Sequence, residues 1–562
     1  MLKTPAIEFT TTPFTQKVRL PGWSLILLGL AYLLPGSLGH VPWRGDDLIH
    51  IAAAAGMLRD GHWLLPHVAG APIFDAPPLH YWLGALFGKL FGWLLPLHDA
   101  IRLATVTTCF LGLWVLRRAA RSLLPHDPKG NGSLLLAIGS LGLLLHAHEA
   151  QPQITLLAML TSSLLGAGWM QRELRTGSMI LGAATGGAFL TMGLPGLILC
   201  GPVFVTAAWL ARKPGLPLLQ EIWPGLLLLA GLLSLWPLLL AFQDPLLVHL
   251  WWHQEWLDIV PQLSPQRLSN TLGLLSWFAW PLWPVAGWAL WNRRSQLRQA
   301  EYAIPLASLV AALLIVVLTG PTRPASALPV LPALVLLAAS ELTRLRRGAV
   351  NWLDWFGIIT FTLSGLFIWL AWIALHFGWP QGLSRNIVRL VPGFVSEVEP
   401  WTVVVALTLS LGWLIALWRL PRFALRPALH WALGITLTWG LLTTLWLDWF
   451  DHDRNYTRVM QEIEAHAGPA PACVATLNVG ASQIAALDYF TQLTVLPYAP
   501  GDMRCTLLVS YASGRNALVE APAGWIRIQE IDKGRGRFRE QIHLYRRIEP
   551  GLSPAGAQRP RS

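Results

Sequence analysis

Apolar segments of roughly 20 residues recur along the chain between residues 23 and 447, and polar residues are concentrated in the connections between them. A segment of this length crosses the hydrocarbon core of a bilayer as an α-helix. The pattern predicts about thirteen membrane helices. Their approximate centres are Leu30, Cys109, Leu141, Leu160, Phe189, Phe204, Leu233, Leu282, Leu313, Leu334, Leu366, Leu407 and Leu441. We therefore expect an α-helical polytopic membrane protein.

Clusters of basic residues follow the even-numbered predicted helices, at 117–121, 172–175, 212–213, 293–298, 344–347 and 419–426. Short loops rich in Lys and Arg remain on the cytoplasmic side of a membrane. A cytoplasmic N-terminus places all these clusters in the cytoplasm, with the apolar segment 23–40 as an uncleaved signal anchor. The same parity places the polar segment 40–98 and everything after residue 450 on the outside.

The composition agrees with a membrane location. Hydrophobic residues make up 54% of the chain and charged residues only 13%, whereas a soluble domain carries about 25% charged residues. The 31 Trp residues suit the aromatic belts at membrane interfaces. The net charge of +11 is spread over short clusters, so it does not form the basic stripe of a nucleic-acid surface. We expect no nucleic-acid partner.

The pattern changes after residue 450. A helix is expected over 453–466 and another over 480–490, with short strands at 472–476, 493–496, 505–509, 525–528 and 541–545. This predicts three regions: a transmembrane domain at 1–449 with an external loop at 40–98, a periplasmic α/β domain at 450–549, and a disordered tail at 550–562. Cys473 and Cys505 lie in two of the strands, either as a disulfide in an oxidising compartment or as two buried thiols. No cysteine or histidine spacing typical of zinc occurs.

Carboxylates lie at both ends of a short stretch of the external loop, namely Asp46, Asp47 and Asp75. Charged groups beside a membrane are costly unless they have a partner or a function. Asp46 and Asp47 begin a predicted helix, and neighbours on a helix point in different directions. We expect one of them to face a site and the other to cap the helix, although both could simply be caps.

The loop carries three motifs in order: Asp46-Asp47, then Gly61-His62-Trp63-Leu64-Leu65-Pro66, then Asp75-Ala76-Pro77-Pro78-Leu79-His80-Tyr81-Trp82. This order resembles the first external loop of the polyprenyl-phosphate-dependent GT-C glycosyltransferases, which include the aminoarabinose transferases acting on lipid A and the protein O-mannosyltransferases. The resemblance continues through 99–103, 280–281 and 328–332. It implies a GT-C architecture in a bacterial inner membrane. It also implies transfer of a sugar from a polyprenyl-phosphate donor to a lipid, glycan or protein acceptor at the periplasmic face.

The resemblance also assigns residue roles. Asp46 falls on the acidic catalytic position and Asp75 on a second acidic position, so both are expected to be catalytic, with Asp47 and His50 supporting the acceptor. A departing phosphate needs cations, and the outside-facing candidates are Arg44, Arg102 and Arg323. A snorkelling interfacial Arg is the alternative for Arg102. A single displacement would invert the anomeric centre. No cofactor is firmly implied, and a divalent cation is left open.

The chain departs from the family pattern at several positions. Ala76 and Met192 stand where relatives carry Lys, and Gln153 stands where many carry Asp; Thr322 and Ser326 stand where relatives carry Lys and Tyr. Several of these basic groups help to hold the lipid phosphate in relatives. The departures favour a second hypothesis, a non-catalytic GT-C-like protein that binds a lipid-linked glycan or a partner. A transporter is a third hypothesis, opposed by polar groups concentrated at the outer helix ends and by the lack of an internal repeat.

Overall fold

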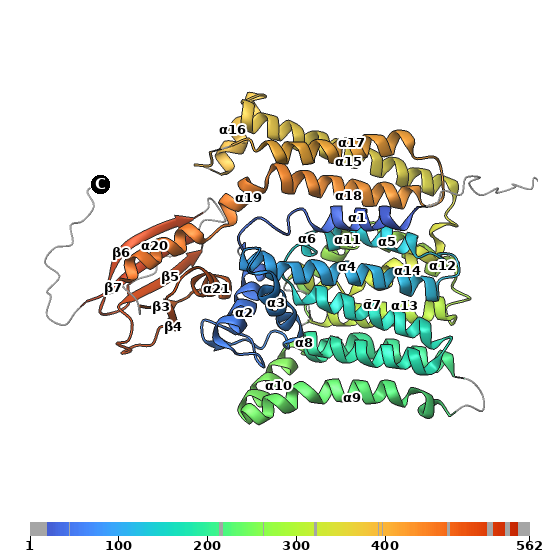
Figure 1. Ribbon diagram of the computed structural model, residues 1–562, viewed down its shortest axis with the longest axis horizontal. Coiled ribbons are helices and arrows are strands. Elements are labelled where there is room, and N and C mark those ends of the chain that lie inside the picture. The colour runs from blue at the N-terminus through green and yellow to red at the C-terminus, as the bar shows by residue number, and fades with distance from the viewer. Residues whose placement is uncertain are drawn as a thin grey trace, which may run out of the picture.

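The structure is a computed structural model that describes residues 20–43, 45–212, 217–261, 263–319, 323–391, 393–395, 397–468, 472–513, 521–533 and 540–548. Its larger part is a bundle of apolar helices, and a small sheet domain projects from one end of the bundle (Figure 1). Helices α2 (Asp46–Asp60) and α3 (Leu79–Phe91) lie between the two. The predicted class, a polytopic helical protein with a small C-terminal α/β domain, is confirmed.

Every predicted membrane-helix centre lies in a helix. The helices concerned are α1 (Gly22–Leu33), α4 (Leu97–Leu123), α6 (Leu141–His146), α7 (Pro152–Met170), α8 (Leu174–Ala211), α9 (Leu218–Gln243), α12 (Leu282–Asn292), α13 (Ala300–Thr319), α14 (Val330–Leu342), α15 (Arg347–Phe377), α17 (Pro400–Arg419) and α18 (Arg426–Leu445). Shorter helices α5 (Asn131–Ile138), α10 (Pro245–Ile259), α11 (Pro265–Phe278) and α16 (Gln381–Leu390) complete the bundle. Within the described residues, 8 helices are long and apolar enough to cross a membrane. The count of thirteen crossings stays a prediction.

Helix α8 contains a sharp reversal, which explains how two predicted centres fall in one helical segment. Met192 and Gly193 have non-helical backbone angles, and Gly193 has a φ of +59°, a conformation that glycine adopts without strain. A Cβ on Gly196 would lie 2.2 Å from the carbonyl oxygen of Ala188. A straight helix would separate these positions by about 12 Å. The two halves of α8 therefore fold back on one another.

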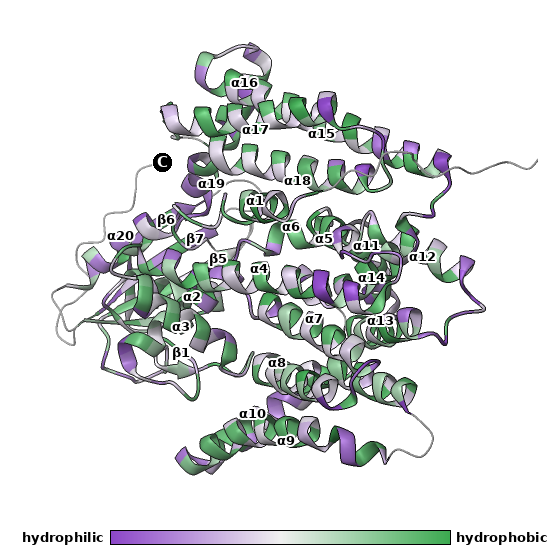
Figure 2. Cartoon of the chain, turned by 45° about the vertical axis from the view of Figure 1, so that its right-hand side comes forward, coloured by the Kyte–Doolittle hydropathy of each residue, from purple (hydrophilic) through white to green (hydrophobic). Residues whose placement is uncertain are grey.

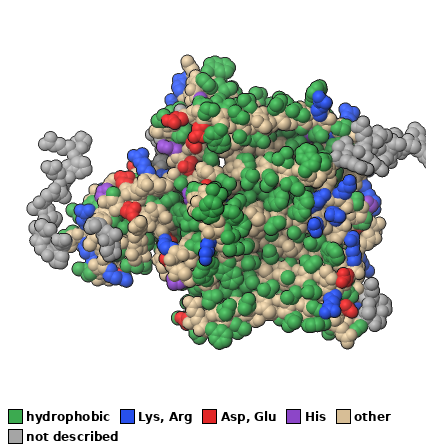
Figure 3. All heavy atoms as spheres, viewed as in Figure 1, with side chains coloured by type: hydrophobic (Ala, Val, Ile, Leu, Met, Phe, Trp, Pro, Cys, Tyr) green, Lys and Arg blue, Asp and Glu red, His purple; other side chains and the backbone are tan. Residues whose placement is uncertain are grey.

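Basic side chains gather at the end of the bundle opposite the sheet domain (Figure 3), and the flanks of the bundle are mostly hydrophobic (Figure 2). Four arginines at this end lie over tryptophan rings, with guanidinium-to-centroid distances of 4.8 Å for Arg117–Trp114, 5.4 Å for Arg294–Trp291, 5.8 Å for Arg346–Trp288 and 4.4 Å for Arg419–Trp418. Such pairs place an aromatic ring and a cation together at a membrane–water boundary. The end of the bundle that carries the basic clusters thus has the side chains typical of a membrane–water boundary.

The C-terminal domain is a five-stranded sheet in the order β4-β3-β5-β7-β6. Strands β4 (Thr494–Pro497), β3 (Cys473–Leu477) and β5 (Leu507–Ser513) are parallel, whereas β7 (Glu540–Arg547) pairs antiparallel with β5 and with β6 (Trp525–Lys533). Helix α21 (Ala481–Phe490) connects β3 to β4. The five predicted strands and the helix at 480–490 are confirmed. The predicted tail at 550–562 lies outside the described residues.

The single helix predicted over 453–466 is wrong. Helix α19 (Leu447–Arg454) ends first, and α20 (Thr457–Ala467) begins after a break. The side-chain oxygen of Asn455 accepts a hydrogen bond of 2.7 Å from the backbone N–H of Thr457. Asparagine side chains favour such caps over a helix interior, so the chain starts a new helix at this point.

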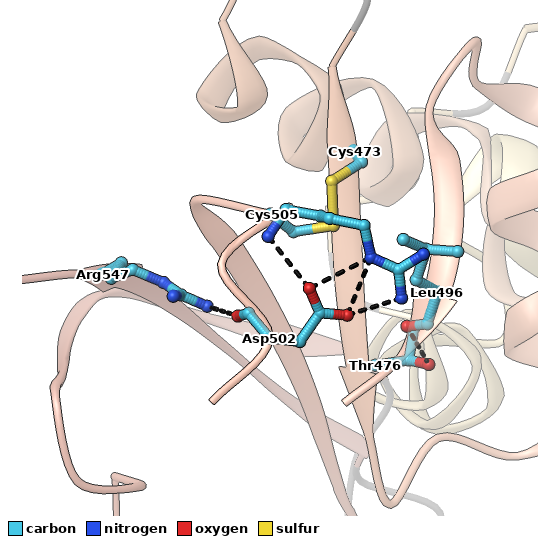
Figure 4. The surroundings of a disulfide bond; sticks show 7 residues. Cys473, Thr476, Leu496, Asp502, Cys505 and Arg547 are labelled. Atoms are coloured by element: carbon cyan, nitrogen blue, oxygen red, sulfur yellow. Dashed lines mark hydrogen bonds and ion pairs between the residues drawn. A yellow bond between two sulfur atoms is a disulfide. The ribbon is translucent and has the colours of Figure 1, made fainter. Parts of the chain in front are cut away.

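A disulfide joins Cys473, at the start of β3, to Cys505, just before β5 (Figure 4). Their Cα atoms lie 5.2 Å apart. Beside it, Asp502 pairs with Arg504 at 2.6 Å, and Arg547 donates to the backbone carbonyl of Asp502. The structure thus decides between the two sequence-based alternatives for these cysteines in favour of the bond.

One hydrophobic cluster unites the external loop with the sheet domain. It contains Leu48 and Met57 of α2 together with Ile463 of α20, Leu487 of α21 and Leu544 of β7. The small hairpin of β1 (His67–Val68) and β2 (Ala71–Pro72) contributes Val68 to the same cluster. Because α2 packs against α21 and shares this cluster with the strands of the sheet, the C-terminal domain and the first external loop form one packed unit.

Candidate active site

The two neighbouring carboxylates at the start of α2 point to different surroundings. Asp47 is 4% exposed and turns inward to Arg102. The side chain of Asp46 is 20% exposed, and its Oδ1 lies 3.1 Å from Nη1 of Arg323. Consecutive residues on a helix diverge in this way. Asp46 is therefore the carboxylate that faces a partly open region.

The carboxylate of Asp47 and the guanidinium of Arg102 form a buried pair, with Nη2 at 2.7 Å and Nε at 3.2 Å from Oδ2. The remaining N–H groups of Arg102 donate to the carbonyl oxygens of His40 and Val41 and to Asp99. All five donors of the guanidinium thus have acceptors within the protein, and its side chain is 1% exposed.

This geometry argues against the predicted phosphate contact of Arg102. An arginine whose donors are all engaged offers none to a lipid phosphate, and exposing it would strand the buried charge of Asp47. Burial alone would raise the pKa of Asp47, but Arg102 and the backbone N–H of Ala150 hold it below its ordinary value. The pair instead ties the start of α2 to α4 and to the segment after α1.

The environment of Asp46 raises the pKa of its carboxyl group. Burial is the largest cause, Glu149 and Asp75 add to it, and Arg323 opposes it. A carboxylate with a raised pKa is a better general base than an ordinary aspartate. Arg323 immediately precedes the short helix η1 (Pro324–Ala327), and its side chain is 42% exposed. The partly exposed guanidinium of Arg323 thus adjoins the carboxylate of raised pKa at Asp46.

Asp75 lies near this pair without touching it. Its side chain is exposed, and within the described part of the chain it has no hydrogen bond or ion pair. Its charge nevertheless contributes to the raised pKa values of Asp46 and Tyr81. The structure therefore brings the two predicted catalytic acids into electrostatic range. The neighbouring Ala76 is 3% exposed within the apolar cluster of α2.

The predicted supporting residue His50 is buried, and its Nδ1 lies 3.0 Å from the hydroxyl group of Tyr81. Burial lowers the pKa of His50 to about 3, so its ring is neutral near pH 7. The ring of His50 thus positions Tyr81, and among the described residues it makes no side-chain hydrogen bond to Asp46. Arg44, the third predicted phosphate ligand, lies outside the described residues.

A cavity of about 230 Å³ adjoins Asp46, between the segments that follow α1 and α6 and the outer ends of α18 and α19. Its lining includes Asp46, Glu149, Trp43, Trp439 and Arg454. We call it the outer cavity. Among the described residues, no group of three or more His, Cys, Asp and Glu side chains is arranged to hold a metal ion.

Several known proteins are similar to this chain in sequence. It is 27% identical over 249 residues to undecaprenyl phosphate-α-4-amino-4-deoxy-L-arabinose arabinosyl transferase 1 of Pseudomonas fluorescens, covering 42% of each chain. It is 27% identical over 283 residues to the corresponding transferase of Edwardsiella ictaluri, covering 46% of this chain and 49% of that one. The chain thus spans about half or less of the length of these curated relatives. No protein-family model matches it.

The fold match extends much further than the sequence match. The structure of ArnT from Cupriavidus metallidurans bound to undecaprenyl phosphate aligns with a TM-score of 0.68 and 18% identity, covering 93% of this chain and 98% of that one. The chain therefore shares the fold of this ArnT structure. This agreement over almost the whole chain includes the C-terminal domain as well as the helical bundle.

Two acidic side chains beside the site were not predicted from the sequence. Glu149 lines the outer cavity, and Glu255 of α10 is 4% exposed. The Glu255 carboxylate accepts hydrogen bonds of 2.8 Å from the backbone N–H of Leu194 and 2.9 Å from Nε1 of Trp251. It holds α10 against the reversal of α8 beside Met192. Each of these acids stands in an apolar or Trp-rich stretch, where a charged residue is a signal of a special role.

Proposed function

We propose that this chain is a membrane glycosyltransferase that moves a sugar from a polyprenyl-phosphate donor to a lipid, glycan or protein acceptor, with inversion at the anomeric carbon. The pairing of Asp46 with Arg323 at the outer end of a GT-C fold supports this proposal most strongly. The pair combines a carboxylate of raised pKa with a partly exposed cation. The name of the Pseudomonas fluorescens relative includes undecaprenyl phosphate and an arabinosyl transferase activity.

The chemistry assigns a role to each member of the pair. Asp46 accepts the proton of an acceptor hydroxyl group as its oxygen attacks the anomeric carbon. The glycosidic bond to the phosphate breaks through an oxocarbenium-like transition state, and direct displacement inverts the anomeric centre. Arg323 neutralises the departing polyprenyl phosphate, for which a planar guanidinium is well suited. Asp75 strengthens Asp46 as a base through its charge.

The proposed location is a bacterial inner membrane, with the N-terminus in the cytoplasm and the C-terminal domain in the periplasm. The basic clusters at the end of the bundle opposite the sheet domain support this orientation (Figure 3). The Cys473–Cys505 disulfide supports it independently, because such bonds persist in oxidising compartments.

A second candidate is a non-catalytic GT-C protein that binds a lipid-linked glycan. The surroundings of Met192 favour this candidate. Met192 stands where the family carries Lys, and the carboxylate of Glu255 accepts a hydrogen bond from the nearby backbone N–H of Leu194. A negative charge at this position opposes the binding of a phosphate there. The two candidates differ in whether Asp46 is needed for transfer.

The deciding experiment uses purified full-length protein in lipid nanodiscs. Radiolabelled undecaprenyl-phosphate monosaccharides, including 4-amino-4-deoxy-L-arabinose, are incubated with a bacterial outer-membrane lipid and glycan extract, and transferred label is counted. We expect Asp46→Asn to lower the transfer rate by about 100-fold or more, the scale of a lost general base. Asp60→Asn, at the other end of α2, is the matched control and should retain transfer.

Two results would contradict the proposal. A folded Asp46→Asn protein with wild-type transfer would remove the assigned base. The lack of transfer by the wild type from every donor in the panel, with undecaprenyl phosphate still bound, would favour the non-catalytic candidate.

Arg323→Ala should weaken undecaprenyl phosphate binding about tenfold or more, as expected for a lost hydrogen bond to a charged group.

A further inference from the structure

Helix α16 follows the long membrane helix α15 directly and lies at the end of the bundle that carries the sheet domain (Figures 1 and 2). The 31 residues of α15 extend over about 46 Å, which is comparable with the thickness of a bilayer including its headgroup regions. Gly378 ends α15 with a φ of +72°, a conformation in which the chain leaves the helix axis. Helix α16 therefore begins at the level of the lipid headgroups.

The residues of α16 divide into an apolar face and a basic face. Leu383 and Ile387 are four positions apart and share one face. This face packs against the core of the helical bundle, and Ile387 is 6% exposed. Arg385 and Arg389 are also four positions apart, and both residues are exposed. An amphipathic helix with basic residues on its polar face is typical of a membrane surface.

No carboxylate among the described residues neutralises these two arginines. The Nε of Arg385 donates to the carbonyl oxygen of Gln381 in its own helix at 3.3 Å. The acids that follow α16 in sequence are Glu397 and Glu399, both exposed. The charge of Glu399 acts on α19, where burial raises the pKa of Asp448 and Glu399 adds to the increase. Two positive charges at headgroup level thus remain without a counter-charge from the described part of the chain.

Large apolar side chains on both sides of α16 in the sequence are exposed. Phe377 at the end of α15 is 70% exposed, Trp379 is 67% exposed, and Trp401 at the start of α17 is 60% exposed. Aromatic residues gather in this way at membrane–water interfaces. Within α16 itself, Leu390 is 67% exposed. The apolar surroundings of α16 therefore suit contact with lipid.

The exposed apolar surface continues from α16 onto the membrane helices beside it. Only 11% of the most apolar window of α17 is buried inside the protein, and only 33% of that of α15. The rest of these two helices faces the hydrocarbon core of the bilayer, because a membrane helix contacts either protein or lipid. The continuity of this surface indicates that the same bilayer, and not a soluble partner, covers α16.

We propose that α16 is an interfacial helix that binds the phosphate group of an anionic phospholipid through Arg385 and Arg389, in the leaflet on the side of the sheet domain. In the orientation proposed above, this is the periplasmic leaflet. A planar guanidinium donates two parallel hydrogen bonds to phosphate oxygens. Anionic headgroups are favoured because each arginine near a membrane surface is attracted by their net charge. The inference is independent of the proposed transfer reaction, because it involves neither Asp46 nor Arg323.

The test measures which lipids surround a probe on α16. Val388 is 52% exposed, so Val388→Cys accepts a thiol-reactive nitrobenzoxadiazole fluorophore on the full-length protein in nanodiscs. Background labelling is low because Cys109 and Cys200 are buried and the other two cysteines are bonded. The nanodiscs contain phosphatidylglycerol and phosphatidylcholine in one fixed ratio. A doxyl quencher near the headgroup is carried by one lipid or the other at the same mole fraction, and aqueous iodide reports exposure to water.

We expect the phosphatidylglycerol quencher to be about twofold or more as effective as the phosphatidylcholine quencher, because two arginines enrich the anionic lipid. Adding Arg385→Gln and Arg389→Gln should make the two quenchers equal. The matched control instead adds Arg458→Gln and Arg546→Gln, which remove the same charge from exposed positions of the sheet domain, and it should preserve the difference. Inorganic phosphate should reduce the difference no more than chloride does at equal ionic strength.

Each of four outcomes would overturn the proposal. Quenching by iodide and by neither lipid would place α16 in water, and protection from all quenchers would indicate that a second copy of the chain covers it. Equal quenching by the two lipids, or a preference that survives Arg385→Gln with Arg389→Gln, would remove the lipid site. Loss of the preference in the sheet-domain control would assign it to the overall charge of the protein. Specific competition by inorganic phosphate would indicate a site for free phosphate.

Discussion

At the scale of the residue, the proposed mechanism depends on one carboxylate among charges of both signs. Burial raises the pKa of Asp46, Glu149 and Asp75 raise it further, and Arg323 lowers it. Because a general base acts in its deprotonated form, the proposed role of Asp46 predicts that activity is lost as the pH falls through this raised pKa. The neighbours should therefore set the acid limit of activity.

This reasoning predicts opposite pH shifts for two substitutions. Arg323→Ala removes a cation that stabilises the charged form of Asp46, so the acid limb of kcat/KM should move to higher pH. Glu149→Gln removes a carboxylate that destabilises it, so the acid limb should move to lower pH. Profiles of kcat/KM against pH for the wild type and both variants measure the shifts. Movement in the same direction would contradict the assignment of Asp46 as the base.

At the scale of the element, α2 is held by residues more than 400 positions away in the sequence. The backbone N–H of Gly45 donates to Oγ of Ser482 in α21 at 2.8 Å, directly before Asp46. At the other end of α2, the guanidinium of Arg59 lies 2.9 Å from the carboxylate of Asp488, which also belongs to α21. Helix α21 thus fixes both ends of the helix that carries the proposed base.

We predict that Ser482→Ala lowers kcat without changing the affinity for undecaprenyl phosphate. The lost hydrogen bond is worth about 0.5–1.5 kcal/mol, which corresponds to a loss of roughly two- to tenfold in rate if it is expressed in the position of Asp46. Ser482→Thr keeps the hydroxyl group and should restore kcat. Steady-state kinetics and a lipid-binding titration are the measurements. An equal loss in both Ser482 variants would show that packing, not the hydrogen bond, matters.

At the scale of the whole molecule, charge and covalent structure indicate the same orientation. Basic side chains occupy one end of the bundle, and the disulfide-bonded domain occupies the other (Figures 1 and 3). Asp46, the proposed base, lies on the side of the bundle that carries the disulfide-bonded domain. This arrangement suits chemistry on a lipid-linked sugar that has already crossed the membrane.

The orientation predicts the outcome of reporter fusions. Alkaline phosphatase fused after Ser562 should be active, and green fluorescent protein at the same point should stay dark. A truncated fusion after Arg294, between α12 and α13, should give the reverse pattern. Thiol alkylation under denaturing conditions should label two more cysteines after reduction than before it, because Cys473 and Cys505 are bonded. A bright fluorescent C-terminal fusion or unchanged labelling would contradict the orientation or the bond, respectively.

Much of the architecture follows from local sequence. Apolar segments long enough to span a bilayer predicted helices whose centres all lie in helices of the structure, because the bilayer requires internally hydrogen-bonded apolar segments. Alternating apolar positions predicted the strands of the C-terminal domain. The divergence of Asp46 and Asp47 also followed from helix geometry alone. These features depend on a few consecutive residues and on the solvent around them.

Only the tertiary structure decided which groups meet. Arg102 reads as an outer cation in sequence, yet its donors are all taken by Asp47, Asp99 and two carbonyl oxygens from the segment after α1. Glu149 became a candidate because packing places it in the cavity that Asp46 lines. Partner choice depends on the summed packing of distant segments, and a buried charge takes whichever partner the fold brings within a few ångströms. No local pattern carries that information.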